Sequence, residues 1–510
     1  MKKRKKKKSK LINLMYLLIW IIPFLIFFKD FLNIGDMKKV IELKTLKILW
    51  NTLYQSFLST IIAFLISLIP TYYIARHKNK ISELIESTLF IPFFFPPIST
   101  IIAFSIIYSI GIFKTLEILY TLEAIIIAHI FYNSPIFVKY IGEALRKIPK
   151  EIVEQAKLEG ATNTKIFFLI ELPIILPSIL RAFFLVFTYC FTSFAIVLSL
   201  GNIKYSTLEV SIVRVLMSSF NFSKALGYAF IQFIMLSIIN YLTTTFDEYI
   251  LEENNEKDKG TPFLISLFSL IYLCFEYGIV FIGIIVSFYN FYTNRIEFTG
   301  VINIFSLEFN KKYPVLLSIL NSILISTVVS LITVIFVYIL LKNKTKFTNF
   351  IILSTMGISS AFLAMSLLYL NISFFVPYPI LIGVGYFLIA VPIGYSFMYQ
   401  HIRGFDFEII EASQIDGANN LQSFIYIEFP LLKNIFLGSF LQIFAIVYGE
   451  FTIAYTMQMQ SSFPIASVIN FSLASKKMFQ ESGAFSALNI LLIFGLFWMS
   501  KKVFKKKREY

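Results

Sequence analysis

Two stretches of this chain carry the same arrangement of carboxylates, small residues and helix breakers. The first reads Glu154-Gln-Ala-Lys-Leu-Glu-Gly160 and, after nine further residues, Ile170-Glu-Leu-Pro173. The second reads Glu411-Ala-Ser-Gln-Ile-Asp-Gly417 and, after nine further residues, Ile427-Glu-Phe-Pro430. The offset of 257 residues is close to half of the 510-residue chain. It indicates one unit written twice, with a polar segment in each copy that does the same work.

Each stretch is predicted to form a helix–turn–helix knob. Gly160 and Gly417 end a short amphipathic helix, because glycine tolerates the left-handed conformation of a helix C-cap. A second short helix follows, and Pro173 or Pro430 breaks it before the next apolar run. A capped loop without a partner would explain one such stretch. Two copies with the same spacing favour a surface that docks into a groove on a partner.

The elements that carry the knobs are predicted to be membrane helices. The chain is 57% hydrophobic, 15% charged and has a mean hydropathy of +0.76, whereas soluble domains carry about a quarter charged residues. Apolar runs of about 18 or more residues can span a bilayer. The predicted spans are 11–28, 53–75, 88–112, 122–141, 176–200, 226–246, 263–290, 314–341, 349–371, 377–399, 431–458 and 486–500.

The basic ends of the chain orient these spans. Eight of the first ten residues are Lys or Arg, and a second basic run covers 501–508. Basic runs that flank spans are cytoplasmic topology signals, which we favour over a nucleic-acid site. The segment 11–28 is expected to remain as an uncleaved first helix. Alternation then places both termini and both knobs in the cytoplasm.

The polar stretch 247–262 is predicted to be a cytoplasmic linker between two halves. The first half is 1–246, an N-terminal helix plus a core of 48–246, and the second is 263–510. Both halves contain a helix that starts at Asn and ends in basic residues, from Asn51 and from Asn321, so they point the same way. We therefore expect an all-α polytopic membrane protein with two tandem six-helix domains, related by a parallel pseudo-two-fold axis.

The repeated pattern resembles the EAA signature, Glu-Ala-Ala-x3-Gly-x9-Ile-x-Leu-Pro, of permease subunits of binding-protein-dependent ABC importers. The first copy departs from it at Gln155, and the second at Ser413 and Phe429. The resemblance covers nearly all of 40–500. Two halves in one chain are similar to the fused permeases of ferric-iron and thiamine importers, which implies a type I importer with a MetI-like fold.

That resemblance implies that the knobs are coupling helices docked on a dimer of ABC ATPase subunits. The sequence has no Gly-x4-Gly-Lys-Ser/Thr phosphate loop, so the chain is expected to be no enzyme and to hold no cofactor, with ATP bound by the partner. An extracytoplasmic solute-binding protein and the lipid bilayer of a bacterial cytoplasmic (inner) membrane are the other expected partners. The coupling positions carried over are Glu154, Ala156, Gly160, Ala161, Asn163, Pro173, Glu411, Ala412, Gly417, Ala418, Asn420 and Pro430.

Glu450 is the carboxylate of most interest inside the predicted spans. A charged group in the bilayer is costly and marks a functional site by default. The position 257 residues earlier is Ser193, so a translocation path there would carry a negative charge on one half alone and would favour a cationic solute. The alternative is that Glu450 hydrogen-bonds a neighbouring helix. Glu276 and His129 are expected to be structural contacts.

Other function classes remain as alternatives. An ion-coupled secondary transporter would need ionisable residues spread through its core. A membrane-embedded enzyme would need His, Asp and Glu clustered at one membrane face. The two cysteines and three histidines of the sequence show no metal-ligand spacing, so no metal site is expected. The solute stays open: ferric ion and a thiamine-like cation are the leading candidates for iron or thiamine transport.

Overall fold

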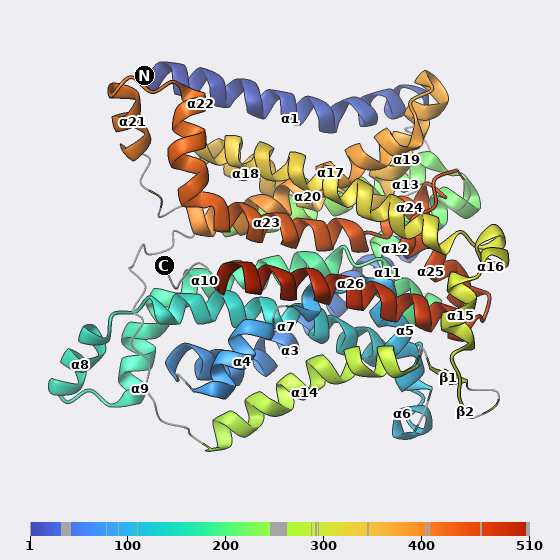
Figure 1. Cartoon of the computed structure of the whole chain (residues 1–510), viewed down its shortest axis with the longest axis horizontal. Coiled ribbons are helices and arrows are strands. Elements are labelled where there is room, and N and C mark those ends of the chain that lie inside the picture. Colours follow the sequence, from blue (N-terminus) through green and yellow to red (C-terminus); the bar gives the residue numbers. More distant parts are fainter. Residues whose placement is uncertain are drawn as a thin grey trace.

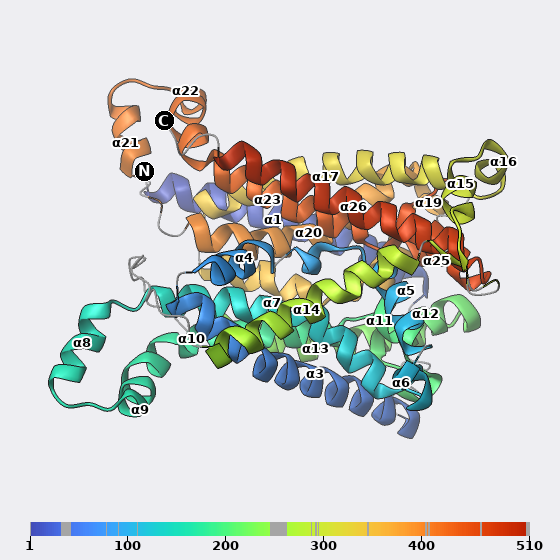
Figure 2. The same ribbon diagram turned by 60° about the horizontal axis from the view of Figure 1, so that its bottom comes forward.

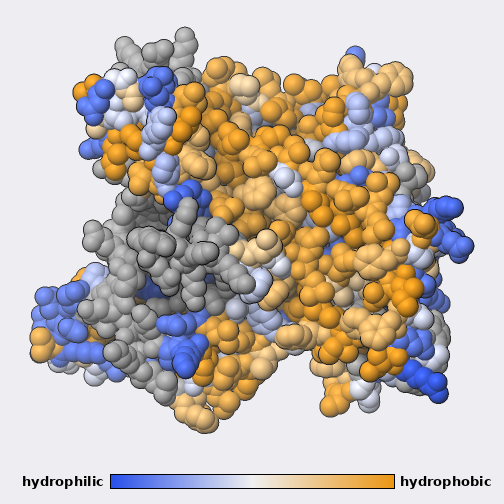
Figure 3. Space-filling model, in the orientation of Figure 1, coloured by the Kyte–Doolittle hydropathy of each residue, from blue (hydrophilic) through white to orange (hydrophobic). Residues whose placement is uncertain are grey.

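The computed structural model is almost entirely helical. It describes residues 2–31, 42–77, 79–89, 91–109, 111–244, 263–286, 288–290, 293, 295–343, 346–402, 405, 408–458 and 462–505. The predicted linker 247–262 lies outside these ranges. Hydrophobic residues cover the middle of the face seen in Figure 3, and hydrophilic residues gather at its two ends. This distribution is that of a protein whose long helices cross a bilayer.

The first half begins with a long helix and ends at Thr244 (Figure 1). Its elements are α1 (Lys2–Phe31), α3 (Leu43–Arg76), α4 (Lys80–Thr88), η1 (Pro92–Phe94), α5 (Pro97–Tyr108), α6 (Gly111–Thr115), α7 (Leu122–Arg146), α8 (Lys150–Leu158), α9 (Asn163–Ile166), η2 (Phe167–Glu171), α10 (Leu172–Phe191), α11 (Ala195–Leu200), η3 (Ile203–Tyr205), α12 (Leu208–Arg214), η4 (Val215–Ser219) and α13 (Phe222–Thr244).

The second half has a similar order of helices, with one short hairpin after its first helix. Its elements are α14 (Phe263–Val286), β1 (Tyr289–Asn290), β2 (Arg295–Ile296), α15 (Thr299–Phe305), α16 (Leu307–Lys312), α17 (Val315–Lys342), α18 (Lys346–Ser354), η5 (Thr355–Gly357), α19 (Ser360–Phe374), α20 (Tyr378–Ile402), α21 (Glu408–Ile415), α22 (Asn420–Ser423), η6 (Phe424–Glu428), α23 (Phe429–Gly449), α24 (Thr452–Thr456), α25 (Ala466–Ser475) and α26 (Phe479–Lys505). The two strands pair antiparallel, Tyr289 opposite Ile296.

Each half has a core of three long helices, and the two cores are built from equivalent helices. In the first half α3, α7 and α10 contact one another, and in the second α17, α20 and α23 do so. Small hydroxyl residues allow the close approach that membrane helices need. Thr52, Ser56 and Thr60 lie buried one turn apart on α3, and each donates to the carbonyl four residues earlier. Ser59 on α3 also contacts His129 on α7, at 3.2 Å, so His129 has the helix contact expected of it.

Not every predicted span is one straight helix. Ten helices of the described chain are long and apolar enough to cross a membrane, or eleven if α18, η5 and α19, bent by 90°, count as one span. The predicted spans 88–112 and 349–371 are therefore each broken into shorter helices. In the first half, Pro92 starts η1 and Pro97 starts α5. In the second, Gly357 packs against α13, where an added Cβ would approach Leu236 Cβ to 2.9 Å.

These broken segments occupy the boundary between the halves. α5 of the first half contacts α25 and α26 of the second, and α19 of the second contacts α12 and α13 of the first. The predicted spans 176–200 and 431–458 are also broken, at Thr192–Phe194 and at Glu450–Phe451. Phe194 and Phe451, the last residues of the two breaks, are 257 residues apart in the sequence, and their rings stack with centroids 5.9 Å apart. Equivalent residues that contact each other indicate that the pseudo-two-fold axis passes between them.

The first helix of each half packs on the opposite half. α1 contacts α17, α18 and α19, and α14 contacts α3, α4 and α5. Buried hydrogen bonds hold α1 in place, from Asn13 to Thr348 at 3.0 Å and between Tyr16 and Thr355 at 2.9 Å. The N-terminal helix thus belongs to the first half in sequence but lies against the second in space.

Candidate functional site

The two predicted helix–turn–helix knobs project from the same end of the molecule. Figure 2 shows α8 with α9 at one corner and α21 with α22 at another, with the start of α1 and the end of α26 at that same end. Knob 1 is defined here as residues 150–171 and knob 2 as residues 408–428. Because equivalent segments lie at one end, the repeat is parallel, as the sequence predicts.

Each knob turns at a glycine in the left-handed region. Gly160 has φ +82° and Gly417 has φ +92°. Ala161 donates to the Ala156 carbonyl at 2.9 Å, and Gly160 donates to the Lys157 carbonyl at 3.0 Å. Knob 2 repeats both bonds, to the carbonyls of Ser413 and Gln414. This is the Schellman pattern of a helix C-terminus, and it confirms the predicted role of the two glycines.

The predicted coupling residues lie on the surface of the knobs. Those classed as exposed are Glu154, Gly160, Asn163, Pro173, Ala412, Gly417, Asn420 and Pro430, and those partly exposed are Ala156, Ala161 and Ala418. The side chain of Glu411 lies outside the described part of the chain. These positions are therefore accessible to a partner, although only their placement, and not their role, follows from the fold.

Sequence reasoning missed the apolar tips of the knobs. Leu158 is 88% exposed and Ile415 is 85% exposed. The two residues are 257 apart and precede their glycines by two positions. A large aliphatic side chain left this exposed at equivalent places is typical of an interaction surface. The repeat offset was the signal that could have found them.

Ser413, the departure from the signature in knob 2, has a local partner. Its hydroxyl lies 2.8 Å from that of Ser423, and both residues are buried. In knob 1 the equivalent positions hold Ala156 and Ile166. A hydrogen-bonded Ser–Ser pair therefore replaces an apolar pair at the same contact between the knob's two helices, which explains why the substitution is tolerated.

The base of each knob holds a buried glutamate that sequence reasoning did not single out. Glu171 pairs with Arg76, the last residue of α3. Glu428 pairs with Lys342, the last residue of α17, at 2.5 Å, and also accepts from the Tyr338 hydroxyl. Both glutamates belong to the repeated Ile-Glu-x-Pro segment, so the identity of this position in the two copies was the available signal.

The two predicted path residues lie next to the stacked rings at the boundary between the halves. Ser193 and Glu450 immediately precede Phe194 and Phe451. The Glu450 carboxylate accepts from the backbone N–H of Ile453, with both oxygens at 3.1 Å, and so caps α24. Its backbone carbonyl accepts from Ser467 at 2.7 Å. The Glu450 carboxylate is thus hydrogen-bonded at the start of α24, at the boundary between the halves.

Glu209 is a second carboxylate at this boundary, and sequence reasoning missed it. It is 1% exposed. Its oxygens accept from Gln232 at 2.7 Å, from the Ser359 hydroxyl at 3.0 Å and from the Ala361 N–H at 3.1 Å. A carboxylate of α12 therefore caps α19 of the opposite half. The sequence signal was an acid inside the apolar run that starts at Leu208.

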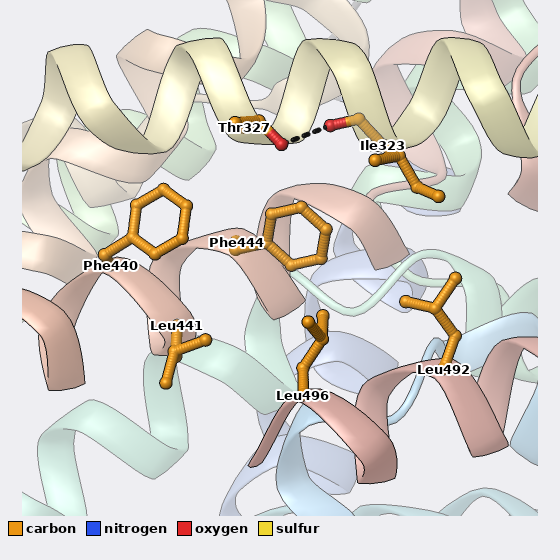
Figure 4. Close-up of a pocket in the computed structure, with 7 residues that line it drawn as sticks. All are labelled: Ile323, Thr327, Phe440, Leu441, Phe444, Leu492 and Leu496. Carbon is orange, nitrogen blue, oxygen red and sulfur yellow. Dashed lines mark hydrogen bonds between the residues drawn. The ribbon is translucent and has the colours of Figure 1, made fainter. Parts of the chain in front are cut away.

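A cavity of about 210 Å³ lies inside the second half, between α17, α23 and α26. Its lining is Ile323, Thr327, Phe440, Leu441, Phe444, Leu492 and Leu496 (Figure 4). The Thr327 hydroxyl donates to the Ile323 carbonyl of its own helix at 2.7 Å. A lining of this kind suits an acyl chain or an empty space better than a charged solute.

Within the described residues, no three His, Cys, Asp or Glu side chains gather in a way that could hold a metal ion.

Comparison with known proteins places the first knob inside a known domain. Residues 71–252 match the family described as "Binding-protein-dependent transport system inner membrane component". This matched stretch contains all of knob 1, while knob 2 lies outside it. Over these residues the chain resembles the membrane components of binding-protein-dependent transport systems.

Proteins from several organisms resemble part of this chain. The thiamine transport system permease protein of Haemophilus influenzae is 36% identical over 132 residues, covering 25% of this chain and 24% of that one. The Escherichia coli thiamine permease is 27% identical over 202 residues, 36% and 38% of the two chains. A probable sulfate transport system permease protein of Helicosporidium is 31% identical over 165 residues, 32% and 61%. The matches thus span under two fifths of the thiamine permeases' length.

Proposed function

We propose that this chain is the membrane subunit of an ABC importer, in which both knobs dock on a pair of ATPase subunits in the cytoplasm. The observation that carries the proposal is the pair of knobs at one end of the fold. They share their turn geometry, their apolar tips and their spacing, and they stand on two halves that meet at a broken-helix boundary. A parallel repeat of this kind matches a partner with two like docking sites.

The chain contributes no hydrolytic chemistry in this proposal. ATP is bound and hydrolysed by the partner, and a solute-binding protein delivers the solute from outside. The residues of this chain do two things. The knobs receive the closure of the ATPases, and the boundary built from α5, α12, α19 and α25 opens alternately to either side. Such coupling needs two global states with different contacts at both places.

The proposed solute is a thiamine-like organic cation. The thiamine permeases among the relatives support this choice over ferric ion. Charge at the boundary supports it too, because the carboxylates of Glu209 and Glu450 each bind a helix start where the halves meet. Both carboxylates are occupied by hydrogen bonds in this conformation, so they would set the field of a path rather than form a ready-made pocket.

The direct test is reconstitution of the chain in vesicles with its ATPase and binding protein. ATP hydrolysis is measured with thiamine, ferric ion and sulfate supplied in turn with the candidate binding protein. Stimulation by thiamine together with ATP-dependent uptake supports the proposal. Uptake driven by a proton or sodium gradient without ATP would instead establish the ion-coupled transporter, and stimulation by sulfate alone would overturn the cationic solute.

A further inference from the structure

The two knobs return to the membrane through the same irregular turn. Residues 167–171 (η2) and 424–428 (η6) are single π-helical turns, 257 residues apart. A π turn carries one extra residue per hydrogen-bonded ring, is rare, and is frequently found at functional sites. The two halves differ at most other positions, yet both have a π turn at this place. This suggests that the turn has a role in both halves.

The last residue of each π turn is the buried glutamate at the base of its knob. Glu171 is bound to Arg76 and Glu428 to Lys342. Both cations are the C-terminal residues of the first core helix in their half. The ion pair therefore ties the root of each knob to the end of α3 or α17, which in turn contacts the two other long helices of its core.

The cations of the two ion pairs do not have the same sequence offset as the glutamates. The glutamates are 257 residues apart, but Arg76 and Lys342 are 266 apart and differ in type. The position 257 residues after Arg76 is Thr333, buried in the middle of α17. Each half thus places a cation at the end of its first core helix, although 95 residues separate the pair in the first half and 86 in the second. A contact kept by different residues indicates that the connection itself matters.

We propose that Glu171–Arg76 and Glu428–Lys342 are the links that transmit movement of each knob to the first core helix of its own half. The inference rests on the proposed function and makes these four side chains positioning residues for coupling. An ion pair at the root of the knob resists separation of the knob from α3 or α17, so a displaced knob carries the helix end with it. The π turn supplies the place where the remaining backbone can adjust.

The glutamate of the second link is the more enclosed of the two glutamates. The side chain of Glu428 is 1% exposed and accepts from both Lys342 and Tyr338, whereas the side chain of Glu171 is 11% exposed. Losing one partner of a buried pair leaves the other charge uncompensated. Neutralising Lys342 is therefore expected to harm coupling more than neutralising Arg76.

The test uses the whole complex of this chain, ATPase and binding protein in vesicles. Arg76→Gln and Glu171→Gln are compared with the reversed pair Arg76→Glu with Glu171→Arg. Three quantities are measured: ATPase retained on the purified chain, ATP hydrolysis stimulated by the loaded binding protein, and solute taken up per ATP. Lys224→Gln is the matched control, because it removes an ion pair to Glu42 at the other end of α3.

The single variants are expected to retain the ATPase while uptake per ATP falls about tenfold, within the usual range of coupling free energies. The reversed pair is expected to recover most of that ratio, and Lys224→Gln to leave it unchanged. Single variants with the normal ratio, or an assembled reversed pair without recovery, would overturn the links. If a single variant does not assemble, Arg76→Lys replaces it, and normal uptake per ATP is expected. Failure of the unaltered chain to retain any ATPase would count against the proposed function instead.

Discussion

The knobs and the membrane boundary differ in what the two halves have kept. Both knobs have acidic residues at three matched positions, Glu151 and Glu408, Glu154 and Glu411, and Glu159 and Asp416. At the boundary, Glu450 of the second half stands at the position equivalent to Ser193 of the first. Glu209, the second residue of α12, corresponds to Ser467, the second residue of α25. Likeness at the knobs fits a partner with two similar grooves. Divergence at the boundary fits a small solute without two-fold symmetry.

The comparison has a second level within the knobs. Lys157 and Lys165 of knob 1 correspond to Gln414 and Gln422 of knob 2. The glutamines are used internally: Gln414 donates to Asn420 at 3.0 Å, and Gln422 forms a reciprocal capping box with Asn419. Knob 2 is therefore braced by amide side chains, whereas the lysines of knob 1 are exposed. The matched acids and unmatched bases predict a basic groove that the more acidic knob 2 binds more strongly.

Proline at either turn glycine should have the largest effect. Gly160→Pro or Gly417→Pro cannot adopt φ near +80 to +90°, because proline fixes φ near about −65° and also removes the N–H that closes the turn. We expect uptake to fall to background while the protein remains in the membrane. Uptake in vesicles and ATPase co-purification measure it. Gly160→Asn is the control, since asparagine tolerates the left-handed region. Normal transport by the double proline variant would contradict coupling through the knobs.

Replacement of Glu209 by leucine should have the second-largest effect. Glu209→Leu leaves Gln232, the Ser359 hydroxyl and the Ala361 N–H without their acceptor, and each buried unsatisfied group costs about 1–3 kcal/mol. We expect a loss of about 3 kcal/mol in the free energy of unfolding, measured by thermal or denaturant unfolding in detergent. Ser467→Ala, at the equivalent position, should cost about 1 kcal/mol. Equal losses would show that the boundary is not asymmetric in this way.

The serine pair of knob 2 offers a reversible exchange. Ser413→Ala leaves the buried Ser423 hydroxyl without its side-chain partner, at a cost of about 1 kcal/mol. Adding Ser423→Ile recreates the Ala–Ile contact of knob 1 and should restore protection. Hydrogen exchange of residues 408–423 reads the local stability directly. A double variant less protected than the single one would mean that the two knobs do not share one packing plan.

Exchange of the knob lysines should have a modest effect. Lys157→Gln with Lys165→Gln removes the two positive charges of knob 1 whose equivalents in knob 2 are glutamines. Exposed charges contribute about 0.2–1 kcal/mol each. Affinity for the ATPase should rise about twofold to fivefold at low salt and return toward the original value at high salt. Binding measured at two ionic strengths checks this. Weaker binding at low salt would show that the groove is acidic, contrary to the matched carboxylates.

Glu450→Gln should have the smallest effect. Its carboxylate accepts from the Ile453 N–H, and the glutamine carbonyl can accept the same bond. Uptake within about twofold of the original value is expected for a capping role. Uptake that falls while basal ATP hydrolysis persists would instead make Glu450 a path residue and would strengthen the asymmetry between the halves.

The sequence predicted those features that depend on composition and on local backbone rules. Hydropathy located the long helices, and the requirement for positive φ identified Gly160 and Gly417. It failed where tertiary packing decides. The local sequence does not show that Gly357 must lie close against α13. Nor does it show that Glu209 caps a helix 150 residues away. The cations opposite Glu171 and Glu428 were also hidden, because Arg76 and Lys342 do not share the 257-residue offset that revealed the knobs.

The crossed placement of α1 has a consequence for how the chain is made. The Asp30 carboxylate accepts from Tyr369, 339 residues later in the chain, and Tyr16 meets its partner Thr355 after the same interval. At about 5–20 residues per second, synthesis of that interval takes roughly 20–70 s. During this time α1 lacks α17, α18 and α19, the helices of the second half that it finally contacts. Biogenesis of this protein therefore includes a waiting period in which an insertase or chaperone that shields the first helix would raise the yield.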